Sequence, residues 1–273
     1  MARGLDHIVH AVRDLEAAAQ AYRALGFTVG ARNRHPWGTH NHIVQFPGFF
    51  IEILTVAEPE NLGDDGFSIL FGGYNRSFLE RHEGFSMLIL ESSDAGADER
   101  DFVRARIAAS SAMRFDREGK RPDGSPVQVA FSLAFARNPL APDVGLAVCQ
   151  QHYPENFWNP DFQSHANGAT GVRGVVMVAA DPGIHADVLA AFAGARAVKS
   201  ETGEIAVGTP RGEIAVMTPQ LFQDRFEVAA PDVSGGARLA ALRLADKVGG
   251  AATVVAADRL FGATLVFEAA EPR

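Results

Sequence analysis

The amino-acid sequence predicts an α+β fold built from tandem βαβββ modules, of which the last is degenerate. Four apolar, strand-like segments each run into an aspartate, at Asp14, Asp94, Asp181 and Asp246. After the first three aspartates the chain continues into helix-like stretches. Shorter segments of alternating apolar and polar residues follow, as in half-buried strands. A pattern that recurs in this way indicates an internal repeat.

The first unit shows the pattern most completely. A strand is predicted at 5–12, with Asp14 as the N-cap of a helix at 15–25 and Gly26 just after its end. Three extended segments follow, at 27–32, 42–46 and 49–54.

The second unit repeats this order with a longer insertion. After Asp94 we expect a helix at 98–113 and strands at 127–135 and 145–151. Basic residues between the helix and these strands are placed in a solvated loop punctuated by Pro and Gly: Arg114, Arg117, Lys120 and Arg121.

The third and fourth units complete the chain. The third has a helix at 183–194 after Asp181, and its extended segments are 196–201, 204–209 and 213–218. The fourth has no room for a helix between Lys247 and Thr253 and continues with strands at 253–257 and 263–269. We therefore expect a module pair at 1–152 that carries the site, an ordered loop at 153–171 and a second, degenerate pair at 172–273. The loop is rich in Pro, Asn and aromatic residues, unlike a flexible Gly/Ser tether.

Composition restricts the class of protein. The formal charge is −8, with 33 acidic and 25 basic residues among 273, which argues against a nucleic-acid binder. Cys149 is the one cysteine, so no intrachain disulfide can form, and it is expected in the core. The N-terminus has no apolar block, and the longest apolar run, 175–180, is too short to span a membrane. A cytoplasmic protein is expected, with no nucleic-acid or membrane partner.

His7 and Glu52 are the leading candidates for chemistry. Glu52 lies between Ile51 and Ile53 in an apolar strand, where an uncompensated carboxylate is costly. A histidine, a metal ion or an arginine can compensate it. The pair therefore predicts a catalytic acid/base or metal site, and the alternative is a structural hydrogen bond between the two side chains.

Further polar residues are candidates for substrate binding. Asn41 and His42 stand at the start of one predicted strand, and the others flank or lie in the 153–171 loop: Gln150, His152, His165 and Asn167. The alternative for these residues is a structural role in turns and loop hydrogen bonds. His10 is expected on the strand face opposite to His7.

Three stretches, 4–27, 34–54 and 151–172, resemble the vicinal oxygen chelate superfamily, in its glyoxalase-like branch of glyoxalases, bleomycin-resistance proteins and extradiol dioxygenases. The resemblance implies that paired modules form two cup-shaped mixed sheets, each around a site. It also implies metal ligands on the first and last strands of paired modules, here His7, Glu52, Met87 and Gln150. Met87 is a poor ligand for a hard metal. The second half lacks such a His/Glu pair, although Glu268 lies near the acid position, so its cup is expected to be structural.

Three functions follow from the resemblance and the residues. The first is metal-assisted lyase, isomerase or dioxygenase chemistry on a vicinal-oxygen substrate, with Fe, Mn, Ni or Zn held by His7 and Glu52. The second is a metal-free small-molecule binding protein of the bleomycin-resistance type. The third is a metal-free acid/base enzyme with Glu52 as the base. The partner is a small molecule in each case, and the chain is expected to be a monomer or a homodimer.

Overall fold

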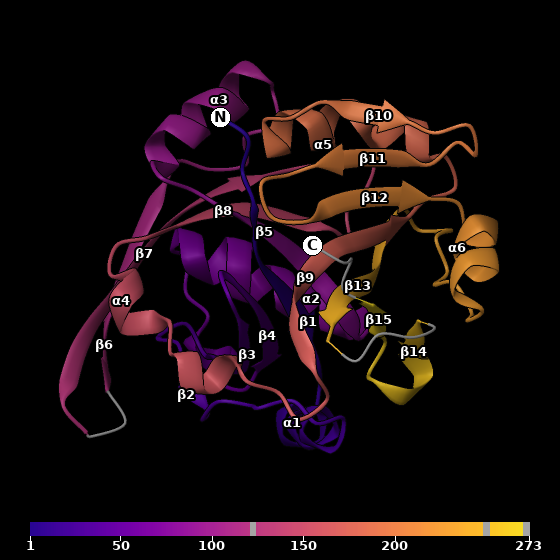
Figure 1. Cartoon of the computed structure of the whole chain (residues 1–273). Coiled ribbons are helices and arrows are strands. Elements are labelled where there is room, and N and C mark those ends of the chain that lie inside the picture. The colour runs from indigo at the N-terminus through magenta and orange to yellow at the C-terminus, as the bar shows by residue number, and fades with distance from the viewer. Residues whose placement is uncertain (121–123, 248–251, 270–273) are drawn as a thin grey trace.

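The computed structural model describes residues 1–120, 124–247 and 252–269. It contains two mixed, curled β-sheets of eight and seven strands with helices packed against them (Figure 1). The predicted α+β fold of βαβββ modules is confirmed. The first sheet contains β1 (Leu5–Ala11), β2 (Asn33–Arg34), β3 (Thr39–Phe46), β4 (Phe49–Val56), β5 (Gly84–Glu91), β6 (Met113–Lys120), β7 (Pro126–Ala136) and β8 (Gly145–Gln151). The second contains β9 (Ala169–Val178), β10 (Ala197–Lys199), β11 (Ile205–Gly208), β12 (Glu213–Met217), β13 (Arg238–Asp246), β14 (Thr253–Val255) and β15 (Thr264–Ala269).

The helices are short and lie between these strands. The α-helices are α1 (Leu15–Ala24), α2 (Tyr74–Arg81), α3 (Ala95–Arg104), α4 (Pro154–Phe157), α5 (Ala186–Ala193) and α6 (Pro219–Phe226). A π-helix, η2 (Ser68–Gly73), precedes α2, and 3₁₀ turns occur at η1 (Pro59–Asn61), η3 (Pro160–Gln163), η4 (Pro182–His185) and η5 (Ala257–Arg259). As predicted, Asp14 and Asp94 cap α1 and α3 by accepting the N–H of Ala17 and Ala97.

The strand orders show the repeat. They are β2-β3-β4-β1-β5-β8-β7-β6 and β10-β11-β12-β9-β13-β15-β14. In each sheet two modules meet through their antiparallel first strands, β1 with β5 and β9 with β13. The first strand of each module also pairs in parallel with the last, as β1 does with β4. The last module is degenerate as expected, since β13 ends at Asp246 and β14 begins at Thr253, which leaves too little chain for a helix like α1 or α3.

Two predicted elements are wrong in extent. Segment 27–32 forms no strand, and β2 begins after it at Asn33. The helix expected at 98–113 covers only Ala95–Arg104. It stops there because Arg106 adopts a left-handed conformation, with φ of 61°, which turns the chain so that Ile107 is buried.

The prediction of a basic loop is also wrong for the part of this segment that the structure describes. Residues 113–120 form β6, an edge strand that pairs with β7 in register, Phe115 opposite Phe131 and Arg117 opposite Val129. Alternation along β6 directs Phe115 and Arg117 to one face and the exposed Arg114 and Asp116 to the other. Arg121 lies outside the described residues.

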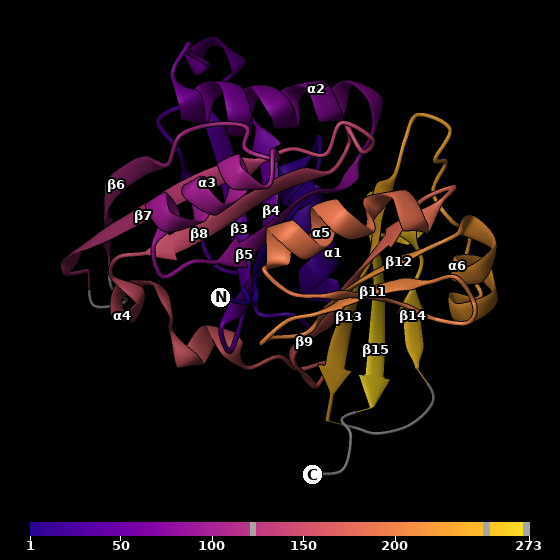
Figure 2. The ribbon, with the colours of Figure 1, turned by 90° about the horizontal axis from the view of Figure 1, so that it is seen from above.

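The largest buried cluster joins the two halves of the chain. It combines one face of each sheet, including Ile51 and Val216, with side chains of α1, α3 and α5. Figure 2 shows α3 and α5 side by side where the sheets meet, and Phe102 packs against Phe192 there. The opposite faces form two smaller clusters, one per sheet. The two cups therefore open on opposite sides of a shared core.

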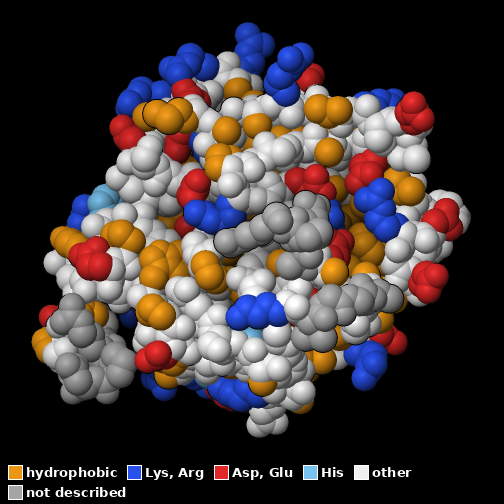
Figure 3. All heavy atoms as spheres, viewed as in Figure 1, with side chains coloured by type: hydrophobic (Ala, Val, Ile, Leu, Met, Phe, Trp, Pro, Cys, Tyr) orange, Lys and Arg blue, Asp and Glu red, His pale blue; other side chains and the backbone are white. Residues whose placement is uncertain are grey.

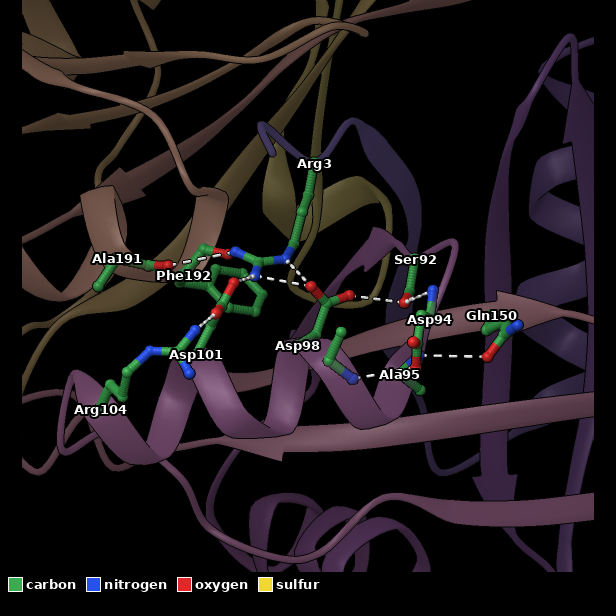
Figure 4. A network of polar contacts seen from close by, with 11 residues as sticks. Arg3, Ser92, Asp94, Ala95, Asp98, Asp101, Arg104, Gln150, Ala191 and Phe192 are labelled. Atoms are coloured by element: carbon green, nitrogen blue, oxygen red, sulfur yellow. Dashed lines mark hydrogen bonds and ion pairs between the residues drawn. The ribbon is translucent and has the colours of Figure 1, made fainter.

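Arg3 ties this junction together (Figure 4). Its guanidinium donates to Asp98 at 2.8 Å, to Asp101 at 3.0 Å and to the Phe192 carbonyl at 2.9 Å, and it lies over the Phe102 ring. The side chain is only 4% exposed. Arg3, two residues before the start of β1, thus connects the N-terminal strand to α3 and α5.

The surface is mixed in charge. Figure 3 shows acidic and basic side chains interspersed on the face seen in Figure 1. Among the described residues, no helix has both the length and the apolar character needed to cross a membrane.

Candidate functional site

The cup of the first sheet encloses a narrow cavity of about 70 Å³. One wall comes from β1, β3 and β4 and the other from β6, β7 and β8, and η2 contributes Phe71. Ring-bearing side chains dominate the lining. The lining residues are His7, His35, Trp37, Asn41, Ile43, Phe50, Glu52, Phe67, Phe71, Phe115, Arg117, Phe131, Leu133, Cys149 and Phe157.

A second, larger chamber of about 440 Å³ adjoins this inner cavity. It lies between β3, the β6–β7 hairpin and the segment 155–162, elements that Figure 1 shows together on one side of the molecule. The two chambers share Ile43, Arg117 and Phe157. The outer chamber is therefore the approach to the inner cavity, and its lining is more polar, with Asn33, Gln45, Glu155, Asn156 and Asn159.

Glu52 lines the inner cavity and is 5% exposed. Alternation along β4 sends Ile51 and Ile53 into the shared core and Glu52 into the cup. Asn41 Nδ2–H donates to Glu52 Oε1 at 2.5 Å, and Asn33 Nδ2–H donates to Asn41 Oδ1 at 3.0 Å. One carboxylate oxygen is thus fixed from the neighbouring strand while Oε2 remains available.

The surroundings of Glu52 raise the pKa of its carboxyl group. Burial raises the pKa of Glu52, and His7, Asn41 and Arg117 oppose this shift in part. Among the described residues, no lysine or arginine forms a salt bridge with this carboxylate.

His7 lies beside Glu52 on the adjacent strand β1, with Nε2 3.9 Å from Oε2. Its Nδ1–H donates to Asp6 Oδ1 at 2.5 Å, and Gln151 Nε2–H donates to Asp6 Oδ2 at 3.0 Å. The imidazole stacks on Phe50 at 4.2 Å. The ring is therefore held so that Nε2 points at the free oxygen of Glu52. The structure brings together the pair that the sequence singled out.

Asp6 and Gln151 were not predicted to support His7. Strict alternation would place Asp6 on the face opposite to its neighbour His7. The pairing of β1 with β5 is irregular between Leu5 and His7, which lets both side chains serve one site. His10 does face the other way, as expected: its Nδ1 is bonded to the Tyr22 hydroxyl at 2.9 Å, and burial lowers its pKa to about 4.

Arg117 stands on the opposite wall and was missed because its segment was predicted to be a loop. It lines both chambers, and its Nε–H is buried with no hydrogen-bond partner among the described residues. Burial lowers the pKa of this guanidinium, and the Glu52 carboxylate opposes the shift. Cys149 lies on the same wall, and burial raises the pKa of its thiol.

His35 and Trp37 belong to the loop between β2 and β3 and line the inner cavity. Their rings stack at 4.8 Å, and Trp37 also stacks on Phe67 at 5.0 Å. His35 Nδ1 is bonded to Thr39 Oγ1 at 2.8 Å, and burial lowers the pKa of His35 to about 3, so the imidazole is neutral at pH 7. The indole Nε1–H of Trp37 is buried without a partner in the described residues.

Two predicted substrate contacts lie on the wrong strand face. His42 is directed toward the Gly30 carbonyl, 2.8 Å away, and toward α1. Gln150 accepts the Ala95 N–H at the start of α3. The parallel pairing of β5 with β8 places Met87 opposite Gly145, just as β1 with β4 places His7 opposite Phe50. The counterpart of Glu52 is therefore Ala147, three residues before Gln150.

The remaining predicted contacts hold the segment after β8 in place. His165 accepts the Thr28 N–H at 3.1 Å and donates to the Gln45 carbonyl at 2.9 Å. Asn167 donates to the Leu25 carbonyl, and His152 is bonded to Ser132 Oγ. None of these three side chains lines either chamber. Of the residues predicted to contact substrate, only Asn41 lines the cup.

The donor set does not fit a resident divalent metal ion. In the described part of the chain, no three His, Cys, Asp or Glu side chains converge as a metal site would require. Met87 accepts a contact from Asn75 Nδ2 and does not line the cavity. The wall facing His7 and Glu52 instead presents Leu133, Phe131 and the cationic Arg117.

Comparison with solved structures shows the same fold in other proteins. A hypothetical protein from Staphylococcus aureus superposes with a TM-score of 0.75 at 12% identity, covering 98% of this chain and 100% of that chain. A triple mutant of 4-hydroxymandelate synthase from Streptomyces coelicolor superposes with a TM-score of 0.54 at 9% identity, covering 89% of this chain and 71% of that one. At these identities the likeness concerns the fold alone. A search of the curated proteins found no match.

The family comparison is more direct. The sequence model of the glyoxalase-like domain matches residues 5–193, a span that includes the whole first sheet and the cup with His7 and Glu52. This confirms the resemblance to the glyoxalase-like branch of the vicinal oxygen chelate superfamily. The chain belongs to the glyoxalase-like domain family.

Proposed function

We propose that the first cup is the active site of a small-molecule enzyme that moves a proton on a carbonyl compound, with Glu52 as the general base. The observation that carries the proposal is the buried carboxylate itself. One oxygen is fixed by Asn41, and the other faces an oriented imidazole and an apolar cavity. Burial that raises the pKa of a carboxylate toward the working pH also makes it a more effective base.

The chemistry requires no further reactant. Glu52 Oε2 takes a proton from the carbon next to a carbonyl group, and the electron pair of the broken C–H bond moves into an enolate. The developing charge is stabilised by buried donors of the cup, of which Trp37 Nε1–H is one. Return of this proton from Glu52 to a different carbon of the enolate completes an isomerisation. Departure of a leaving group from the enolate gives a lyase reaction instead.

Metal-assisted chemistry is the second candidate, and one observation favours it. A carboxylate that holds the far nitrogen of a histidine, as Asp6 holds His7, also occurs behind metal-bound imidazoles. The argument against metal-assisted chemistry is that only His7 and Glu52 are offered as ligands, and no three such side chains converge in the described residues. Elemental analysis of the wild type and His7→Ala, purified without chelator, decides: a stoichiometric metal that is lost in the variant favours this candidate over the metal-free one.

Solvent-deuterium exchange tests the proposed base. The probes are 2-oxobutanoate and 1-hydroxy-2-butanone in D₂O, and proton NMR follows the loss of the C–H signal beside the carbonyl. We expect the wild type to accelerate exchange and Glu52→Gln to lower the rate about 10²- to 10⁴-fold, the usual contribution of a general base. Glu60→Gln, an exposed acid in η1, is the matched control and should exchange like the wild type.

Two outcomes oppose the proposal. If exchange persists in Glu52→Gln, Glu52 is not the general base. A wild-type protein that binds a probe, seen as a change in tryptophan fluorescence, but does not accelerate exchange supports a binding protein of the bleomycin-resistance type instead.

A further inference from the structure

Two buried donors without partners in the described residues belong to side chains that line the first cup. Trp37 Nε1–H and Arg117 Nε–H are both inaccessible to solvent, and both lack a hydrogen-bond partner in the described residues. Both side chains line the same inner cavity. Since an unsatisfied buried donor costs about 1–3 kcal/mol, such groups need an explanation. Two of them around one cavity indicate a ligand that brings acceptor oxygens.

Arg117 is placed where it can contact such a ligand. It belongs to the linings of both chambers, so its guanidinium borders the passage between them. Among the described residues it is the one lysine or arginine that lines either chamber. Its charge acts on Glu52 and on His35, which stand on other elements of the cup. The positive charge is therefore central to the site.

We propose that the substrates of this cup are carboxylic acids and that Arg117 is the specificity-determining residue that binds the carboxylate. This inference rests on the proposed function and names the substrate class of that site. The planar guanidinium matches the two oxygens of a carboxylate with parallel donors. The small inner cavity then takes the carbonyl-bearing end beside Glu52, and the rest of the molecule extends into the outer chamber.

The volumes and ring arrangement favour a carboxylate over a bulkier oxyanion. The inner cavity of about 70 Å³ holds only a few heavy atoms, and stacked ring pairs make up much of its wall. A tetrahedral phosphate needs more of that small space than a planar carboxylate does. A purely structural role for Arg117 is the competing explanation, because an inward-pointing charge on an edge strand such as β6 discourages association of sheet edges.

The chain contains its own reporters for a binding test. Its two tryptophans line the two chambers, Trp37 the inner and Trp158 the outer. Titrations use 2-oxobutanoate, its neutral analogue 2-oxobutanamide and inorganic phosphate, with fluorescence as the readout. They are run in Glu52→Gln, which lacks the base, so that failure of the proposed proton transfer cannot affect the result. Trp158→Phe repeats the titration with Trp37 alone.

Arg117→Met and Arg117→Lys are the test variants, and Arg114→Met, an exposed arginine of the same strand, is the control. We expect the acid to bind at least tenfold more tightly than the amide. Arg117→Met should weaken acid binding about 10- to 100-fold, the range for a charge-assisted hydrogen bond, and leave the amide unchanged. Arg117→Lys should retain part of the preference, and Arg114→Met all of it.

The opposing outcomes are distinct. Equal binding of acid and amide overturns the inference, as does an unchanged acid preference in Arg117→Met. If phosphate binds as tightly as the acid, the site accepts oxyanions in general, and the proposed selectivity for carboxylates is wrong. Arg117→Met could self-associate in size-exclusion chromatography while the soluble Arg117→Lys keeps the full preference for the acid. This combination supports a structural role of the charge and overturns recognition of the carboxylate by the planar guanidinium.

Discussion

Arg3→Met isolates the polar contribution of the junction between the two halves. Methionine keeps an unbranched apolar stem that can pack on Phe102, so the change removes mainly the guanidinium. The variant leaves the Phe192 carbonyl and the Asp98 carboxylate without this donor, and Asp98 is only 14% exposed. Each charge-assisted hydrogen bond of this kind contributes about 1.5–3 kcal/mol. Asp101 is 38% exposed, so its link adds little after solvent screening.

We expect Arg3→Met to lower the free energy of unfolding by about 3 kcal/mol, within the range for breaking a buried charge pair. Urea denaturation followed by circular dichroism measures it. Arg104→Met is the matched control, because Arg104 bonds the same Asp101 but is 71% exposed. It should cost less than about 1 kcal/mol.

A cost of Arg3→Met equal to that of Arg104→Met would refute the reasoning, since burial is the property that separates the two arginines. A double-mutant cycle with Asp98→Asn adds a second check. Coupling between Arg3 and Asp98 well above 0.5 kcal/mol is expected for residues in direct contact.

Two further predictions concern the cup and its covering segment. Glu52→Gln should raise the melting temperature at pH 8 more than at pH 4, as differential scanning calorimetry can show. The pKa of Glu52 is raised in the folded protein, so the stability that this group contributes is present below its unfolded pKa and lost as pH rises through its folded pKa. His165→Ala should cost about 2–3 kcal/mol by the same urea assay and speed proteolysis within 153–164, because the Thr28 N–H and the Gln45 carbonyl lose their partner. Wild-type cleavage rates would contradict it.

The parts of the site that the sequence predicted are those fixed by local pattern. Period-two alternation around Glu52 places it opposite the core face of β4, and the same rule gives the inward direction of His7. Gln150 failed because its position was counted along the chain, whereas the partner of a strand residue is set by hydrogen bonding between strands. Asp6 could not be found by alternation, since an irregular pairing sets its direction.

Arg117 shows a second reason why part of the site could not be predicted from the sequence. Pro122 and Gly124, which follow β6 in the sequence, gave the whole basic segment the composition of a loop. The alternation of Phe115 and Arg117 with Arg114 and Asp116 was the signal that a strand was present, with a charge on the inner face. An inward-facing arginine becomes part of a site only when the sheet curls and brings β6 across from β4. That arrangement depends on tertiary structure, which local pattern does not contain.

The contrast between the two cups is the best argument that Glu52 serves chemistry. In the second cup, Phe222 and Phe226 of α6 pack into the apolar cluster, and Arg243 forms ion pairs with Glu213 and Glu268. Glu213 and Glu268 are thus neutralised by one arginine of the same sheet. The same solution is open to the first cup, where Arg117 already faces inward. Instead Glu52 has one amide donor and an imidazole 3.9 Å away, and its burial is opposed only in part. A carboxylate left in this state lowers stability, and such a cost is characteristic of a group held ready to exchange a proton.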